Sequence, residues 1–279
     1  MGLLSRLEKL DRRWLYAILA ALVIGPMVRP LYFPLEVSAP VRGFYDAIRQ
    51  VPDGSTVLMA CDYDPSTRPE MVPMTMTAMR QLFDKHCKVV VTVLWNGGPG
   101  IVDQTLRRVA SEYPDKRYGV DWVNLGYKAG YEAVMVLMGQ GIANAFPVDY
   151  GNHRTNDYVA LPIMQNVRDY SSFPLLVSIS AGYPGTKEWV QQVNSRFHIP
   201  MISGSTAVQA PEFYPYLQSG QIRGLLGGMA GAAEYEKLRN ERGSATRGMD
   251  AQSLAHVFVA LCILLGNLVQ WRKRRGVAA

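Results

Sequence analysis

Asp62 and Asp64, two aspartates separated by one residue, are the side chains of this chain whose types and spacing best suit chemistry. They follow an apolar run from Thr56 to Cys61, which has the length of a buried strand. Ligands of open parallel sheets bind outside the carboxyl ends of the strands, so an acidic pair at a strand end is the sharpest chemical candidate in the chain.

The segment from Val57 to Thr67 resembles the first motif of the haloacid dehalogenase-like phosphohydrolases, in which a strand ends in D-x-D. The resemblance implies that one of Asp62 and Asp64 is the nucleophile, that the other is the acid and base, and that the pair helps to hold magnesium. The chain departs from the family in two places. Ser66 stands where the family usually has Thr or Val, and the segment Ile199 to Thr206 ends in Ser203, Gly204 and Ser205 instead of a late acidic pair.

The same acidic segment also has a structural explanation. Asp64 can cap the loop that follows the strand, and Thr67 and Glu70 have the S/T-x-x-E spacing of a capping box that opens a helix. We therefore expect a structural or ligand-contacting role for the pair, with catalysis as the alternative. No cofactor or metal ion is expected, because the four histidines are scattered and have no cysteine partner at ligand spacing.

The elements around this pair alternate between strands and helices. Apolar runs predict five strands, at Thr56–Cys61, Lys88–Trp95, Tyr118–Leu125, Pro174–Ser180 and Pro200–Ser203. Helical spacing predicts helices at 41–51, 69–86, 101–113, 129–143, 161–170 and 186–197. Strands that are apolar on both faces and are separated by helices indicate a parallel sheet covered on two sides. The fold class expected is α/β, with a Rossmann-like or flavodoxin-like sheet of about five strands.

Ligands of open parallel sheets bind outside the carboxyl ends of the strands. The loops expected at that edge contain small, polar and aromatic residues, which suit close backbone approach, hydrogen bonding and ring stacking. The ligand-binding residues predicted there are Asp62, Tyr63, Asp64, Asn96, Gly97, Gly98, Lys128, Ser180, Tyr183 and Ser205. Asn96 to Gly100 is a glycine-rich turn into a helix but lacks the Lys-Ser/Thr of a phosphate-binding loop, so a tight turn is its default interpretation.

Two uncharged apolar runs flank this central part. The second, from Ser253 to Trp271, would reach roughly 28 Å as a helix, about the thickness of the hydrocarbon core of a bilayer. The first starts at Trp14 and is interrupted by Arg29, which can snorkel. The organisation expected is a basic N-terminus at 1–13, a span at 14–34, an α/β domain at 35–250, a span at 251–271 and a basic tail at 272–279. The first span is interpreted as an uncleaved anchor.

The net charge of +6 is concentrated at the two ends. Residues 1–29 hold five basic and two acidic side chains, the tail adds four basic ones, and the interior has 20 basic and 21 acidic residues. This distribution argues against nucleic acid as a partner, since a nucleic-acid-binding domain would carry the excess on its folded part. It follows the positive-inside rule, so both termini are expected in the cytoplasm and the domain outside it.

Three further positions indicate association. Gly224 and Gly228 lie in a glycine-rich apolar segment that forms either a strand turning into a helix or a site of close packing, and Asn267 is a polar residue within the second span. Asn267 can pair with the first span or with another protein. The function expected is a non-catalytic, membrane-anchored subunit of a larger membrane assembly or a receptor for a small ligand. The alternative is a membrane-tethered phosphohydrolase that uses Asp62 and Asp64. The three cysteines are expected to be free thiols.

Overall fold

The computed structural model describes residues 11–277, and the side chains up to residue 271. The predicted basic N-terminal segment lies mostly outside the described residues, as does the end of the basic tail. Contacts divide the chain into two units, Leu35–Ala245 and a second one made of Met1–Pro34 with Thr246–Ala279. Each unit is described separately.

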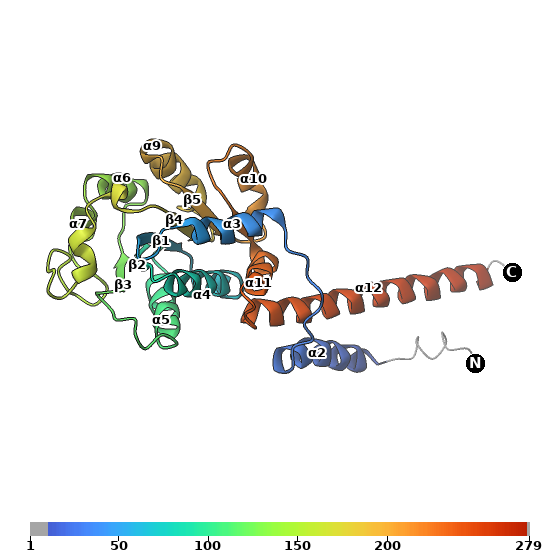
Figure 1. Ribbon diagram of the computed structural model, residues 1–279. Coiled ribbons are helices and arrows are strands. Elements are labelled where there is room, and N and C mark those ends of the chain that lie inside the picture. Colours follow the sequence, from blue (N-terminus) through green and yellow to red (C-terminus); the bar gives the residue numbers. More distant parts are fainter. Residues whose placement is uncertain (1–10, 278–279) are drawn as a thin grey trace. The chain divides into compact units, whose positions relative to one another are not determined.

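The first unit is a Rossmann-like α/β domain built on a six-stranded parallel sheet (Figure 1). Its strands are β1 (Thr56–Asp62), β2 (Lys88–Val93), β3 (Trp122–Tyr127), β4 (Leu176–Ser180), β5 (Met201–Ser205) and β6 (Leu225–Gly227). They lie in the order β3-β2-β1-β4-β5-β6, which is the doubly wound order of Rossmann domains. The parallel α/β prediction is therefore confirmed, and the flavodoxin-like strand order is not observed.

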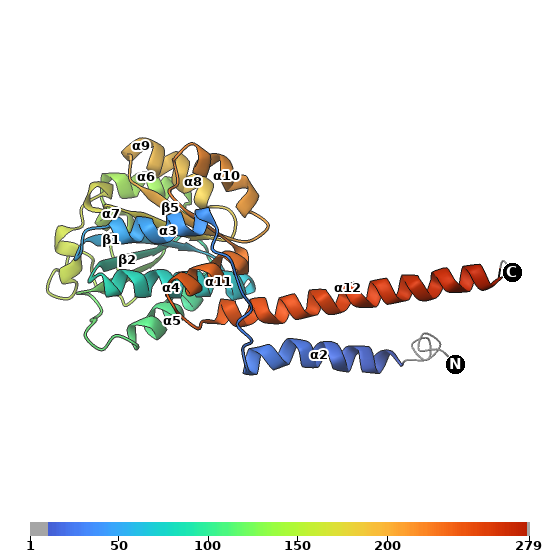
Figure 2. The ribbon, with the colours of Figure 1, turned by 45° about the vertical axis from the view of Figure 1, so that its right-hand side comes forward.

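Helices cover both faces of the sheet (Figures 1 and 2). The first group contains α3 (Ala39–Gln50), α4 (Arg68–Asp84), α5 (Pro99–Ala110) and α11 (Gly228–Leu238). The other face carries α6 (Glu132–Gln140), α7 (Ile142–Ala145), α10 (Ala210–Gln218) and a segment made of α8 (Thr186–Trp189), a π-helical turn (Val190–Asn194) and α9 (Ser195–Phe197). Two buried layers of apolar side chains result, because the strand residues alternate between the faces.

Four local predictions from the sequence differ from the structure. The sheet has a sixth strand, β6, which the glycine-rich segment supplies before it turns into α11. The predicted helix at 161–170 is two short 3-10 turns, Pro162–Asn166 and Tyr170–Ser172. The predicted helix at 129–143 is divided into α6 and α7. The expected linker at 245–250 is helical, since α12 runs from Ser244 to Val277 without interruption.

Close packing explains the two glycines assigned to association. A Cβ atom on Gly224 would lie 2.0 Å from the backbone nitrogen of Phe44 in α3. Gly228 has a φ of +61° and faces Ala207 and the carboxylate of Glu70. Both glycines are buried inside the α/β domain, so intradomain packing accounts for them and they offer no surface to a partner.

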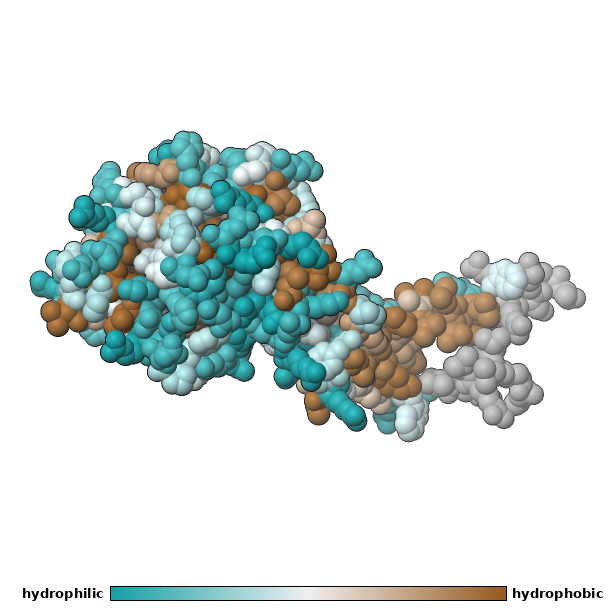
Figure 3. Space-filling model, in the orientation of Figure 1, coloured by the Kyte–Doolittle hydropathy of each residue, from teal (hydrophilic) through white to brown (hydrophobic). Residues whose placement is uncertain are grey.

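The second unit contains α2 (Arg12–Val28) and most of α12. One helix among the described residues, Ser244–Trp271, is long and apolar enough to cross a membrane. The first span is not confirmed, because α2 has 17 described residues and contains Pro26. Figure 3 shows brown, apolar residues over both helices, whereas hydrophilic residues predominate on the visible face of the α/β domain.

Asp250 joins the chain after α2 to α12. Its carboxylate accepts hydrogen bonds from three consecutive backbone N–H groups, those of Leu31, Tyr32 and Phe33, at 2.9, 2.9 and 3.2 Å. The Asp250 side chain is buried, so these bonds compensate the charge of a carboxylate that water does not reach. Asp250 therefore fixes the end of the α2 segment to the start of α12.

We predict that Asp250→Ala exposes the amides of residues 31–33 to solvent exchange. Hydrogen bonds to a charged group contribute about 1.5–3 kcal/mol, so amide exchange there should become roughly ten-fold faster or more. Hydrogen exchange measured on the detergent-solubilised protein checks this, and Asp250→Asn, which retains one acceptor oxygen, should give a smaller increase. Unchanged exchange in Asp250→Ala would show that the three bonds do not restrain this segment.

The sheet core gives a second prediction. Ile179 is fully buried in β4, a central strand, so Ile179→Ala should lower the free energy of unfolding by roughly 2–5 kcal/mol through loss of burial and a residual cavity. Val208 is 89% exposed, and Val208→Ala should change it by at most about 0.5 kcal/mol. Denaturant unfolding followed by tryptophan fluorescence compares the two variants. A similar loss in both would contradict the assigned burial.

Candidate functional site

The candidate site lies at the carboxyl ends of β1 and β4. The chain places β2 and β3 on one side of β1 and then β4, β5 and β6 on the other, so successive connections run in opposite directions from this point. Open α/β sheets bind their ligands at this position. β1 and β4 are neighbours, with Asp62 paired in register to Ser180. β2 lies on the other side of β1, so the loops after β1, β2 and β4 converge there.

Asp62 forms the floor of this position and is fully buried. Its Oδ1 accepts a hydrogen bond of 2.7 Å from the backbone N–H of Leu94, which follows β2. Its Oδ2 accepts one of 2.7 Å from the indole N–H of Trp189 in α8. Both carboxylate oxygens therefore have protein partners, and the Asp62 side chain connects three separate elements.

Burial dominates the electrostatics of Asp62. Loss of hydration raises the pKa of its carboxyl from 3.8 to about 7. The two hydrogen bonds from Trp189 and Leu94 favour the ionised form and lower the pKa, but by less than burial raises it. The nearby Glu188 carboxylate raises the pKa further by repulsion. The Glu188 side chain is itself engaged, since it accepts a hydrogen bond of 2.8 Å from the N–H of Gly185.

Asp64 has a different environment, because it is half-buried whereas Asp62 is fully buried. Its Oδ1 accepts hydrogen bonds from the backbone N–H and the hydroxyl of Ser66, at 2.9 and 2.6 Å. These bonds begin the 3-10 turn Pro65–Thr67, so the predicted capping of the loop by Asp64 is confirmed. The predicted capping box is wrong: Thr67 makes no side-chain cap, and Glu70 accepts a hydrogen bond from the N–H of Ala207 after β5.

Aromatic side chains gather on the loops that follow β2, β3 and β4. The indole N–H of Trp95 donates a hydrogen bond of 2.8 Å to the carbonyl of Pro184, and a Cβ atom on Gly182 would lie 2.7 Å from the Trp95 ring. The ring of Tyr183 lies 5.5 Å from the ring of Tyr131, which follows β3. The strands of these two tyrosines are separated by β2 and β1, so the loops after β3 and β4 meet beyond the ends of the two central strands.

The predicted ligand-binding residues fall into two groups. Asp62, Tyr63, Gly98, Ser180 and Ser205 are buried, and Tyr63 accepts a hydrogen bond from the hydroxyl of Thr75 through its own hydroxyl. Asn96, Gly97 and Tyr183 are exposed, whereas Asp64 and Lys128 are half-buried. Only this second group faces solvent, and ligand contact by its members stays a prediction.

Ser180 belongs to a buried network of hydroxyl groups. Thr186 Oγ1 lies 3.0 Å from Ser180 Oγ and 2.6 Å from Ser203 Oγ, and Ser180 Oγ also accepts from the N–H of Thr186. Ser205 Oγ is buried and has no hydrogen-bond partner among the described residues. This network joins β4, β5 and α8 beneath the surface and presents no hydroxyl group to a ligand.

The sequence did not identify Trp95, Trp189 and Tyr131 as residues of this position. Trp95 lies in the predicted second strand, and Trp189 and Tyr131 lie in segments predicted as helices. A tryptophan indole needs a hydrogen-bond acceptor when it is buried, which is the signal that connects Trp189 with a buried carboxylate.

No group of three or more metal-ligating side chains is found within the described residues. The three cysteines are free, with Cys61 and Cys87 buried in the α/β domain. Comparison of the chain with protein-family models, curated proteins and solved structures finds no match. The chemistry of the site therefore has to be inferred from its own contacts.

The raised pKa of Asp62 predicts that the protein loses stability as the pH rises. Between about pH 4 and 7 the folded protein retains a proton on Asp62 that the unfolded chain releases, so the free energy of unfolding should fall across this window and level off above it. The pKa difference corresponds to at most about 4 kcal/mol. In Asp62→Asn this contribution to the slope should disappear. Denaturant titrations from pH 4 to 8 compare the slopes, and identical slopes would show that Asp62 does not titrate in this range.

Proposed function

We propose that this chain is a non-catalytic, membrane-anchored subunit of a larger membrane assembly, with a Rossmann-like domain outside the cytoplasm. One observation carries the proposal: the Asp62 carboxylate is fully buried, and each of its oxygens accepts a hydrogen bond from the protein. A catalytic nucleophile has to reach a substrate, and a magnesium ligand has to be accessible to the ion. Neither requirement is met by this carboxylate.

The arrangement of Asp64 supports the same conclusion. Its Oδ1 is occupied by Ser66, and no third acidic side chain joins it and Asp62 in a metal-ligating group within the described part of the chain. The positions that a phosphohydrolase would use for chemistry therefore serve the fold. Other molecules would therefore bind to the surface of the chain, which includes the apolar surface of α12.

The membrane arrangement belongs to this proposal. The helix Ser244–Trp271 supplies one span, and we propose that residues 14–34, which include most of α2 and the segment after it, supply the second, with both termini in the cytoplasm. The basic residues beside the two apolar runs support this orientation. α2 alone is roughly 25 Å long, so residues outside it have to complete the crossing.

The activity test uses the purified full-length protein in a mild detergent with magnesium and a phosphate monoester. We predict that wild type and Asp62→Asn release phosphate at the same background rate and that both co-purify with the same partners. Asp64→Asn is the matched control, because it also removes a carboxylate charge from the same loop. Magnesium-dependent release that disappears in Asp62→Asn would establish the phosphohydrolase and refute the non-catalytic role.

The topology test uses single cysteines and a membrane-impermeant thiol reagent on intact cells. Asp115→Cys in the α/β domain, where the native side chain is 70% exposed, should be labelled, whereas Ala278→Cys should be labelled only after the membrane is permeabilised. The matched background replaces Cys262 by serine and retains Cys61 and Cys87, which are buried. Labelling of both positions, or of neither, in intact cells would contradict the proposed orientation.

A further inference from the structure

The polar side chains of α12 lie on one face of the helix. Between Ser253 and Trp271 the hydrogen-bonding side chains are those of Ser253, His256, Asn267 and Gln270. At about 100° per residue these four positions fall within an arc of about 100°. Ala260 and Ile263 lie in the same arc and complete an alternating spacing of three and four residues. We call these six residues the polar seam: Ser253, His256, Ala260, Ile263, Asn267 and Gln270.

The opposite face of the same span is entirely apolar. It consists of Leu254, Phe258, Leu261, Leu265, Leu268 and Val269. Acyl chains of lipids suit this face, but they offer no hydrogen bonds to amide, imidazole or hydroxyl groups. Intramembrane polar side chains usually face other helices for this reason. The separation of the two kinds of residue therefore indicates that a protein surface covers the polar seam.

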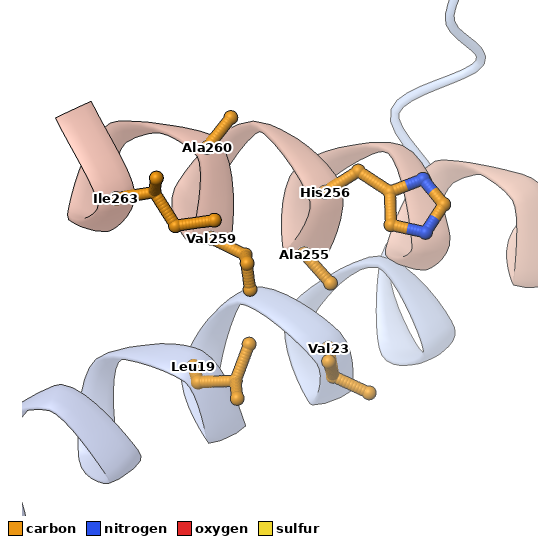
Figure 4. A pocket seen from close by; sticks show the side chains of 7 residues that line it. All are labelled: Leu19, Val23, Ala255, His256, Val259, Ala260 and Ile263. Carbon is orange, nitrogen blue, oxygen red and sulfur yellow. The ribbon is translucent and has the colours of Figure 1, made fainter.

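α2 covers only part of the polar seam. α2 and α12 form a groove of about 500 Å3, lined by Leu19, Val23, Ala255, His256, Val259, Ala260 and Ile263. Figure 4 shows Val259 pointing toward α2 and Ala260 pointing away from it. The side chains of His256, Asn267 and Gln270 are exposed, and none of them has a hydrogen-bond partner among the described residues. The α2 groove thus reaches His256, Ala260 and Ile263 at one edge of the seam but provides no hydrogen bond to its polar side chains.

We propose that α12 pairs along the polar seam with α12 of a second copy of this chain, as a parallel dimer with two-fold symmetry. The proposal rests on the assembly role proposed above and names the partner. In such a dimer each residue near the axis meets its own copy at the same depth. Asn and Gln amides, a neutral histidine ring and a serine hydroxyl each contain both a donor and an acceptor, so each can pair with itself. Ala260, which is small, allows close approach at the centre of the seam.

A second copy of α12 can hydrogen-bond to the four polar side chains of the seam more simply than a different helix can. A different protein would have to present hydrogen-bonding side chains at the depths of all four polar residues. A second α12 provides them automatically. The three-and-four spacing is also that of the contact positions in paired helices, which supports a helix as the occupant of the seam.

The test compares two neighbouring positions of α12 that lie at nearly the same depth but point to different sides of the helix. Ala260→Cys lies on the seam, and Leu261→Cys lies about 100° around the helix at nearly the same depth. Both variants also carry Cys262→Ser, and the two remaining cysteines are buried in the α/β domain. Full-length protein in isolated membranes is oxidised with copper phenanthroline. We expect several-fold more disulfide-linked dimer from Ala260→Cys than from Leu261→Cys.

Asn267→Leu in the Ala260→Cys background provides the second measurement. Leucine keeps the helix apolar and folded but removes one pair of hydrogen bonds, which should lower the dimer yield by about three-fold or more. Leu268→Ile is the control on the apolar face and should leave the yield unchanged. An unchanged yield in Asn267→Leu would overturn the seam as the contact.

The remaining outcomes separate this inference from the proposed function. Equal dimer yields at positions 260 and 261 would overturn pairing along the seam. A crosslink from position 260 to a different protein would overturn self-pairing but leave the assembly role intact. Failure to form any adduct, together with purification as a lone monomer, would overturn both.

Discussion

The buried carboxylate of Asp62 is the interaction on which the candidate site depends. Burial removes the hydration of this carboxyl and raises its pKa to about 7, and the N–H groups of Leu94 and Trp189 replace only part of that hydration. These two bonds connect the end of β1 with Leu94 after β2 and with the last residue of α8. The same burial and hydrogen bonds that hold this edge together keep the Asp62 carboxyl away from solvent.

The parallel sheet could be predicted from the sequence because its strands are buried on both faces. Runs such as Val89, Val90 and Val91 contain β-branched residues without alternation, which is typical of strands covered on two sides. β6 was harder to predict, since three residues of a glycine-rich segment contain little periodicity. Its position depends on the approach of Gly224 to Phe44, a contact between residues far apart in the chain.

The roles of the two aspartates could not be predicted to the same extent. The sequence places both at a strand end, but Asp62 is the last residue of β1 and turns into the core, whereas Asp64 already belongs to the following turn. The partner of Asp62, Trp189, is 127 residues away, and nothing local connects the two. The serine that follows Asp64 by two residues is a local signal, and the predicted capping of the loop by Asp64 is confirmed for that reason.

The polar side chains buried in the α/β domain and those within the apolar part of α12 differ in whether they have hydrogen-bond partners. This difference favours association through the helix. In the α/β domain the buried polar side chains mostly have partners, as in the Asp62 bonds and the hydroxyl network around Thr186. In α12 the amides of Asn267 and Gln270 have none among the described residues, although the helix is apolar enough to enter a bilayer. Unsatisfied polar groups cost most where water is absent. The stronger reason to bind another chain therefore lies in α12, while the Asp62 carboxylate and the hydroxyl groups around Thr186 already have partners within the domain.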